Sequence, residues 1–219
     1  MPGAQSKEPP VNTTARAERH VAVNELKRSL IIQAARRVFE ADGLDGASVR
    51  AIAKAAGYTT GAIYFHFPSK EAIYAEVLRE MLERLVGDVQ RAVAAAGTPR
   101  ERLTMTGLGF FDFFANDPRD LEFGFYLFKG GLRPRGLSRE LDAELNARLA
   151  TSLAPIGEAA IELGAGKAEA RSIQADLFAH AVGLLLLKHT HRIRMFGADP
   201  RKLMQGYLAA ISTRLERLD

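Results

Sequence analysis

The segment at residues 48–70 carries the side chains best suited to recognising a ligand. A short helix is expected to follow Thr59 and to end before Pro68, and many of its positions hold small or hydroxyl side chains. Glycine inside a helix costs about 1 kcal/mol relative to alanine, so Gly61 is a poor choice for a helix that only packs. A helix whose backbone must approach the major groove of DNA has a use for such residues. The composition therefore predicts a DNA-contacting helix.

Two cations in the same segment indicate phosphate binding. Arg50 lies near the start of one short helix, and Lys70 lies at the start of the long helix that follows. A cation at a helix N-terminus opposes the helix dipole by about 0.3–1 kcal/mol. A phosphate bound there would relieve the conflict and accept from the free backbone N–H groups. Simple solvation of both cations is the alternative, and it is weakened by Tyr64 and His66 on the same small, polar helix.

Helical periodicity accounts for the placement of these side chains. Apolar residues three and four apart begin at Leu26 and continue to Phe39, and Gly43 is expected to end that first helix. Ser48 is a favourable N-cap for a helix over 49–56. Gly57 then provides the tight turn to the next helix, because glycine accepts a positive φ. Two short helices joined by a tight turn behind a longer helix are typical of a helix-turn-helix.

The stretch SVRAIAKAAGYTTGAIYFHFPSKEA, residues 48–72, resembles the N-terminal signature of TetR-family transcriptional regulators, and residues 31–43 resemble the first helix of that family. The resemblance covers about residues 24–80. It implies phosphate contacts from Tyr64, Lys70 and the helix start at Ser48. The residues that it implies for base or groove contacts are Arg50, Thr59, Thr60, Gly61, Ala62 and His66. Tyr58 departs from the pattern, because the family more often has a smaller aliphatic residue there.

The rest of the chain is expected to be helical as well. The segments expected to form helices are about 99–115, 118–129, 138–163 with a kink at Pro155, 167–195 and 199–218. No alternating strand pattern occurs, so the predicted fold class is all-α with about nine helices. We divide the chain into a disordered arm at residues 1–22, a helix-turn-helix DNA-binding domain at 23–72 and a helical ligand-binding and dimerisation domain at 73–219.

Two features of this helical body bear on function. Eight aromatic residues between Phe110 and Phe128 exceed what two helices need for packing and are suited to lining an apolar pocket, with ordinary core as the alternative. The candidate ligand-binding residues are Phe110, Phe114, Phe123, Tyr126 and His180. The resemblance further implies that the last two helices form a dimer, and their apolar stripes agree with this. The candidate interface residues are Phe178, Ala181, Leu185, Leu203, Tyr207 and Ile211.

Composition narrows the function classes. The chain has 219 residues, no cysteine and a formal net charge of +4. Disulfides, thiolate metal sites and cysteine nucleophiles are therefore excluded, and the mild positive charge permits nucleic-acid binding without requiring it. His189 and His191 are two residues apart and would lie on opposite sides of a helix, so they do not form a metal site there. No catalytic or dinucleotide-binding motif occurs, and we predict no cofactor, no metal and no enzyme activity.

These observations predict a homodimeric repressor that binds a pseudo-palindromic operator in double-stranded DNA and is released by a small apolar or amphipathic effector. A DNA-binding protein without an effector is one alternative, and an all-helical enzyme is a weaker one, which would show turnover without DNA binding. The apolar run at 181–187 is far shorter than the ~20 residues of a spanning helix, so we expect a cytoplasmic protein with no membrane partner.

Overall fold

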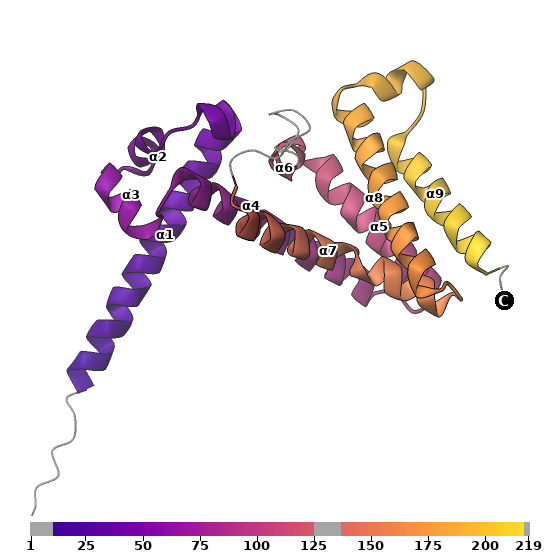
Figure 1. The fold of residues 1–219 in the computed structure, drawn as a ribbon, viewed down its shortest axis with the longest axis horizontal. Helices are drawn as coiled ribbons and strands as arrows, with labels where there is room; N and C mark the ends of the chain where they lie inside the picture. The colour runs from indigo at the N-terminus through magenta and orange to yellow at the C-terminus, as the bar shows by residue number, and fades with distance from the viewer. Residues whose placement is uncertain (1–10, 125–136, 217–219) are drawn as a thin grey trace, which may run out of the picture. The chain divides into compact units, whose positions relative to one another are not determined.

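A computed structural model describes residues 11–124 and 137–216, and every regular element in these ranges is a helix (Figure 1). The predicted all-α class is therefore confirmed. The internal contacts group the chain into two compact units, Met1–Tyr74 and Ala75–Asp219. The division follows Tyr74, whereas the sequence led us to expect it after residue 72.

The N-terminal unit contains α1 (Val11–Gly46), α2 (Val49–Ala56), α3 (Thr60–His66) and the first residues of α4 (Lys70–Ala94). Its core is apolar: Ile31, Ile52 and Ile63 are at most 1% exposed. Phe39 and Tyr74 meet edge to face with ring centroids 4.9 Å apart. These side chains come from all four helices of the unit and hold the two short helices against α1.

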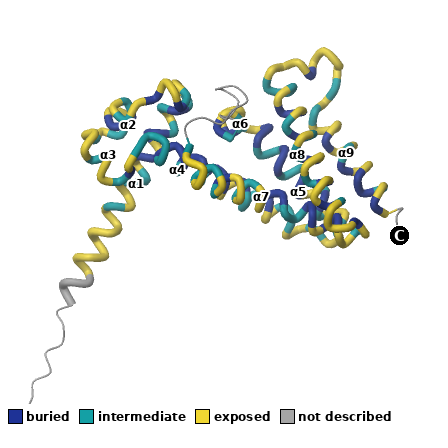
Figure 2. The backbone as a smooth tube through the Cα atoms, in the orientation of Figure 1, coloured by how far each residue is buried: buried dark blue, intermediate teal, exposed yellow. Residues whose placement is uncertain are grey.

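The helix α1 begins earlier than the sequence analysis predicted. Residues 11–22 were assigned to a disordered arm, but they are helical and continuous with the rest of α1. The segment follows Pro10 and contains no further proline or glycine, and its alanine, arginine and glutamate residues favour a helix. Residues 15–23 are exposed (Figure 2). At the other end, Gly43 interrupts α1 with φ 69°, at the residue where the helix was expected to end.

The C-terminal unit is built around α5 (Pro99–Asn116), which packs against α7 (Arg139–Glu162), α8 (Lys167–His189) and α9 (Pro200–Leu215). A short helix, α6 (Pro118–Gly124), follows α5, and the 3-10 helix η2 (Arg192–Phe196) lies between α8 and α9. Pro155 lies within α7 without ending it. The predicted helix at 167–195 was too long, because α8 ends at His189 and His191 takes a left-handed conformation with φ 59°.

The end of α5 is fixed by two side chains from α8. Lys188 Nζ donates to the carbonyl oxygen of Ala115 over 2.6 Å, and His189 Nε2 lies 2.9 Å from the carbonyl oxygen of Phe114. The last carbonyls of a helix have no partner within the helix, so donors from outside must satisfy them. These two contacts therefore anchor the C-terminus of α5 in the bundle.

By length and composition alone, α8 would be able to cross a membrane. Within the C-terminal unit, however, Ile173, Leu177 and Leu185 are at most 1% exposed, and the helix packs against α5, α7 and α9. The apolar character of α8 is therefore that of a core helix in a folded bundle.

Gly107 of α5 lies directly against Leu208 of α9. A Cβ atom at this position would lie 2.6 Å from Leu208 Cδ2 and 3.3 Å from Leu177 Cδ1. Neither distance is compatible with ordinary van der Waals contact. The absence of a side chain at Gly107 therefore allows Leu208, which is fully buried, to occupy the space between the helices.

We predict that Gly107→Val lowers the free energy of unfolding by about 1–3 kcal/mol, because the new side chain overpacks the α5–α9 contact. The matched control is Gly87→Ala in α4, where the new Cβ would meet its nearest neighbour at an ordinary 3.5 Å. This control should keep or raise stability by up to ~1 kcal/mol. Urea denaturation of both variants measures the difference, and equal stability of the Gly107 variant and wild type would contradict the packing described here.

Candidate DNA-binding surface and ligand cavity

Both short helices of the N-terminal unit begin with a hydroxyl cap. Ser48 Oγ accepts from the backbone N–H of Ala51 over 3.1 Å, and Thr59 Oγ1 accepts from that of Ala62 over 3.2 Å. Ser48 and Thr59 both have extended backbone, as N-cap residues require. Each hydroxyl still carries a hydrogen that is available to a further acceptor. The two helix starts therefore combine free backbone donors with exposed hydroxyl groups, which suits an anion.

The turn between α2 and α3 depends on Gly57. Its φ is 72°, and its N–H and that of Tyr58 satisfy carbonyls at the end of α2, with Tyr58 N 2.9 Å from Ala53 O. Such a left-handed cap favours glycine because a Cβ atom is strained there. The turn then directs α3 so that Ile63 is buried against the other helices while its opposite face remains open.

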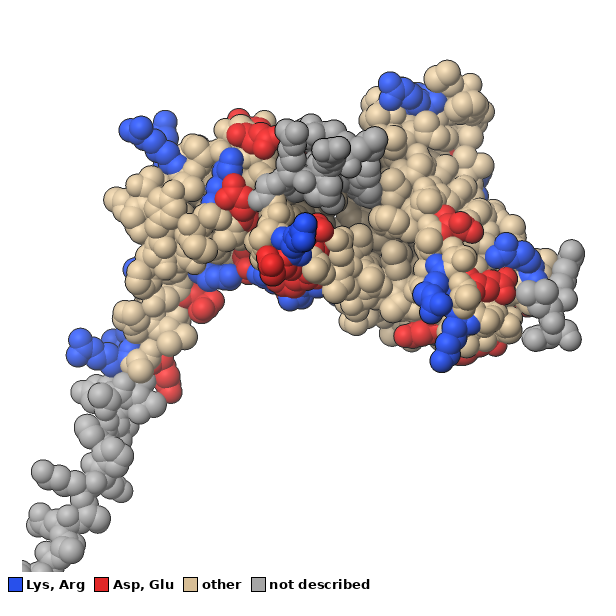
Figure 3. Space-filling model, viewed as in Figure 1, with Lys and Arg blue, Asp and Glu red and all other residues tan. Residues whose placement is uncertain are grey.

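The open face of α3 holds most of the side chains predicted to contact DNA. Thr60 and Gly61 are exposed, Tyr64 is 56% exposed, and Ala62 and His66 are half-buried. Arg50 is exposed at the start of α2. Lys and Arg side chains project from this unit in the region of α2 and along α1 (Figure 3).

The sequence analysis missed Phe65. This residue is 75% exposed on α3, and its ring meets His66 edge to face at 5.1 Å. Phe65, His66 and Tyr58 line a hollow of about 230 Å³ with Asn24, Lys27, Ile31 and Ala62. In the sequence, the position of Phe65 on a short helix between Tyr64 and His66 was the available sign of its exposure.

Lys70 has a structural role that the sequence did not reveal. Its ammonium group donates to the carbonyl oxygens of Leu44, over 2.7 Å, and Ala47, over 3.1 Å. These carbonyls belong to the end of α1 and the turn into α2. A lysine ammonium has three donors, so one remains after these two bonds. The proposed phosphate contact of Lys70 would therefore use the third N–H.

An apolar cavity of about 220 Å³ lies inside the C-terminal unit. The predicted ligand-binding residues Phe110, Phe114 and Phe123 line it, and they are buried among helices of this unit. The remaining described lining residues, which the sequence analysis did not select, are Leu78, Met81, Leu82, Gly124, Leu137, Asp142, Leu145, Asn146, Leu149 and Phe178. The leucines of α7 follow a four-residue spacing that was indistinguishable from ordinary core packing.

The other two predicted ligand-binding residues, Tyr126 and His180, are not among the described residues that line the cavity. Tyr126 lies outside the described residues. His180 does not line the cavity: it stacks on Tyr207, with ring centroids 4.0 Å apart and an interplanar angle of 15°, between α8 and α9. Burial lowers the pKa of His180, and its Nε2 is buried without a hydrogen-bond partner. The apolar surface of α8 has two sides, and His180 belongs to the side that meets α9, so its predicted ligand contact is not one of those that this cavity offers.

The wall of the cavity formed by α6 is held by a charge pair. Asp120, whose side chain is 3% exposed, accepts from Arg84 Nη2 of α4 over 2.8 and 3.0 Å. Phe123 and Gly124, which line the cavity, follow within one turn of α6. A buried carboxylate is tolerated only when it is paired, so this contact fixes α6 to α4.

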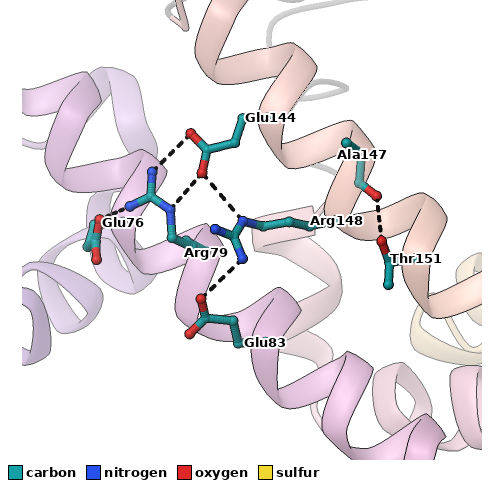
Figure 4. Close-up of polar contacts among 7 residues, drawn as sticks. All are labelled: Glu76, Arg79, Glu83, Glu144, Ala147, Arg148 and Thr151. Atoms are coloured by element: carbon teal, nitrogen blue, oxygen red, sulfur yellow. Dashed lines mark hydrogen bonds and ion pairs between the residues drawn. The ribbon is translucent and has the colours of Figure 1, made fainter.

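The outer edge of α4 and α7 carries a network of ion pairs (Figure 4). Arg79 of α4 contacts Glu76 and donates from Nε to Glu144 of α7 over 2.8 Å, and Arg148 of α7 reaches Glu83 over 3.2 Å. Hydrogen bonding from Arg79 lowers the pKa of Glu144. These pairs join the two helices beside the cavity and engage both arginines.

The predicted dimer residues divide into buried and accessible groups. Ala181, Leu185 and Ile211 are at most 6% exposed, and Phe178 lines the cavity. These four residues pack inside their own chain and are not available to a second one. The sequence-based assignment of these residues to a dimer interface is therefore corrected. Leu203 is 43% exposed and Tyr207 is half-buried.

A different face of α8 and α9 is accessible and apolar. Most of its exposed residues are alanine or glycine, and two are leucine. They are Ala175, Ala179, Gly183 and Leu186 on α8, and Leu203, Gly206 and Ala210 on α9. The spacings 179/183 and 206/210 place small residues one turn apart, which allows close helix approach. The sequence contains this spacing of small residues, but the sequence analysis gave weight to the large apolar residues of the same helices instead.

The chain thus combines a helix-turn-helix, whose α3 has an open face, with a helical bundle that contains an apolar cavity. This arrangement is that of a helix-turn-helix regulator. Residues 31–77 match the family described as "Bacterial regulatory proteins, tetR family". This match covers the end of α1, α2, α3 and the start of α4, so the N-terminal unit is similar to the helix-turn-helix domain of that family.

Two curated relatives and one solved structure illustrate the likeness. The chain is 38% identical over 86 residues to the HTH-type transcriptional repressor KstR2 of Mycolicibacterium smegmatis, which is 39% of this chain and 42% of that protein. It is 34% identical over 91 residues to the HTH-type transcriptional activator FasR of the same organism, 42% of each chain. The chain therefore spans about two fifths of the length of the curated relatives it matches.

The whole fold resembles that of the transcriptional regulator FadR from Bacillus subtilis, whose structure was solved in complex with stearoyl-CoA. The TM-score is 0.62 at 21% identity, with 84% of this chain and 97% of that chain covered. This likeness extends the shared architecture to the C-terminal unit.

We predict two effects of Lys70→Ala. Loss of the bonds to Leu44 and Ala47 should destabilise the N-terminal unit by about 1–3 kcal/mol, because two carbonyls lose their donor. Loss of a phosphate contact should also lower the slope of log affinity against log salt by about one per half-site. Lys54→Ala, an exposed cation on α2, is the control for charge alone. A destabilised variant with an unchanged salt slope would restrict Lys70 to its structural role.

Proposed function

We propose that the protein is a cytoplasmic, homodimeric repressor of transcription that leaves its operator when a small apolar molecule occupies the cavity of the C-terminal unit. The observation that carries this proposal is the open face of α3, on which Thr60, Gly61 and Tyr64 are exposed behind the Thr59 cap. The family match and the names of the curated relatives, which include repressors and an activator, support a role in transcription.

On DNA, α3 would enter the major groove. Small side chains at Gly61 and Ala62 would let the helix backbone approach the bases, while Arg50, Thr60 and His66 would supply groove contacts. Ser48, Tyr64 and Lys70 would hold flanking phosphates. Phosphate contacts fix the register of a protein on the duplex, and base contacts select its sequence. This division of roles assigns specificity to α3 and affinity to the surrounding donors.

The accessible apolar face of α8 and α9 would pair with the same face of a second chain. A twofold interface is self-complementary, so small residues such as Ala179 and Gly206 would meet their counterparts or one another. Two recognition helices would then reach half-sites about 10 bp apart. The proposed dimer replaces the buried residues of the sequence-based interface with exposed ones.

The cavity would be the effector site. An engineered cavity of about 150 Å³ accepts benzene, so a cavity of about 220 Å³ has room for a somewhat larger apolar molecule. Leu78, Met81 and Leu82 of its wall belong to α4, the same continuous helix that begins with Lys70. A ligand that changes the position of these residues would act on the DNA-binding unit through this helix. Ligand and DNA would then weaken each other's binding equally.

Selection of duplexes from a random pool tests the DNA-binding proposal. We expect wild type to enrich a pseudo-palindrome with two half-sites. Thr60→Glu should abolish enrichment because the carboxylate would face phosphates, yet it should fold normally because an acidic residue favours the first turn of a helix. Gln90→Glu, exposed on α4 in the C-terminal unit, adds the same charge elsewhere and should keep binding. A Thr60→Glu variant that still selects the same sequence would refute the assignment of α3.

The dimer proposal has its own test. Ala179→Glu should yield monomers in sedimentation at micromolar concentration, since burying an unpaired charge costs several kcal/mol. Operator affinity should fall because each monomer has one half-site. Gln205→Glu adds the same charge at an exposed position of α9 outside the row formed by residues 203, 206 and 210, and this variant should remain dimeric. Dimers in the Ala179 variant would move the interface to another surface.

A further inference from the structure

The polar groups of the cavity are confined to one wall. Ten of the thirteen lining residues are leucine, methionine or phenylalanine, and the polar side chains among them are Asp142 and Asn146. Both belong to α7 and lie one helical turn apart. Asp142 is half-buried and Asn146 is exposed, so this polar wall lies where the cavity meets solvent. A ligand bound among the aromatic rings would therefore have its polar end here.

This wall is rich in acceptors. Asn146 Nδ2 donates to Asp142 Oδ2 over 3.2 Å. This bond leaves the amide carbonyl of Asn146 and the second carboxylate oxygen of Asp142 as further acceptors on two residues that line the cavity. Carboxylates only accept hydrogen bonds when ionised. The wall thus complements a group that donates hydrogen bonds or carries positive charge.

No cation offsets this acceptor wall within residues 11–124 and 137–216, where neither Lys nor Arg lines the cavity. The arginines on the neighbouring α4–α7 edge are engaged elsewhere: Arg79 contacts Glu76 and Glu144, and Arg148 contacts Glu83 and Glu144 (Figure 4). Three carboxylates face two guanidinium groups in this network. Among the residues that the structure describes, this network therefore has one more carboxylate than guanidinium group, which adds to the attraction of Asp142 for a cation.

We propose that the effector is a compact aromatic or alicyclic amine whose protonated nitrogen binds Asp142 and Asn146 while its rings fill the cavity. This inference rests on the cavity being the effector site proposed above. The rings would lie against Phe110, Phe114 and Phe178, and the ammonium group would donate to the carboxylate at the rim. Charge-assisted hydrogen bonds of this kind are stronger than neutral ones. The amine would therefore be favoured over an apolar molecule of the same shape.

Three probes with one ring system test the proposal: 1-naphthylmethylamine, 1-methylnaphthalene and 1-naphthoate. Calorimetric titration of the full-length dimer should give at least about tenfold tighter binding for the amine than for the hydrocarbon, as expected for one charge-assisted contact. The carboxylate should bind most weakly. The amine should also release operator DNA at the lowest concentration of the three.

Asp142→Asn removes the charge while keeping the size of the side chain. It should reduce the preference for the amine over the hydrocarbon to less than about threefold, with little change in hydrocarbon affinity. Glu140→Gln is the matched control, because Glu140 lies in the same first turn of α7 but does not line the cavity. It should keep the full preference. Thermal melting of both variants confirms that each is folded.

The outcomes separate this inference from the proposed function. Hydrocarbon binding without an advantage for the amine, or an unchanged preference in Asp142→Asn, would leave the cavity as an effector site and overturn the amine. Tightest binding of the carboxylate would overturn it as well. If no probe binds while operator binding persists, both the amine and the cavity as effector site are wrong.

Discussion

The ammonium group of Lys70 holds the N-terminal unit together at the point where three segments of chain converge. It donates to the carbonyl oxygens of Leu44 and Ala47, which lie between the end of α1 and the start of α2. These carbonyls follow the break at Gly43, where the helical bonding pattern of α1 is interrupted. A cation is favourable at a helix C-terminus, because it satisfies free carbonyls and complements the dipole. The orientation of α2 relative to α1, and with it that of α3, depends on this contact.

The C-terminal unit uses the same solution at the end of α5. Lys188 and His189 of α8 satisfy the carbonyls of Ala115 and Phe114, directly beside the aromatic rings that line the cavity. In both units a basic side chain from one helix fixes the end of another, and candidate site residues lie next to the fixed end. The cavity walls are thus held at α5 by these contacts and at α6 by the Arg84–Asp120 pair. An apolar space persists there because polar contacts around it keep the helices in place.

The sequence was informative where a residue type has one dominant physical reason. Gly57 at a left-handed turn and Ser48 at a helix start were predicted correctly because few alternatives exist for either. Helical periodicity likewise predicted the all-α fold. It did not distinguish the two sides of an apolar helix, so Ala181 and Leu185 were assigned to a dimer although they are core.

The roles of polar residues that depend on long-range packing were harder to predict. An aspartate in the first turn of a helix, such as Asp142, already has a local reason to be there, because it complements the helix dipole. Its second surrounding, the cavity, arises only when α4, α5 and α7 pack together. Lys70 is a similar case, because the carbonyls that it contacts are more than twenty residues away in the chain. Long-range packing therefore gave these residues roles that local sequence patterns did not contain.

The contact between Gly107 and Leu208 has a consequence for how this protein evolves. The two positions occupy one shared volume, since a Cβ atom at 107 would lie 2.6 Å from the leucine side chain. A larger residue at 107 is accepted only after 208 becomes smaller, and a smaller residue at 208 leaves a void until 107 grows. Among descendants of this sequence, the two positions should therefore change as a pair. Helix α5 contributes to the cavity and α9 to the accessible apolar face, so substitutions that alter one surface are constrained by the residues already present at the other.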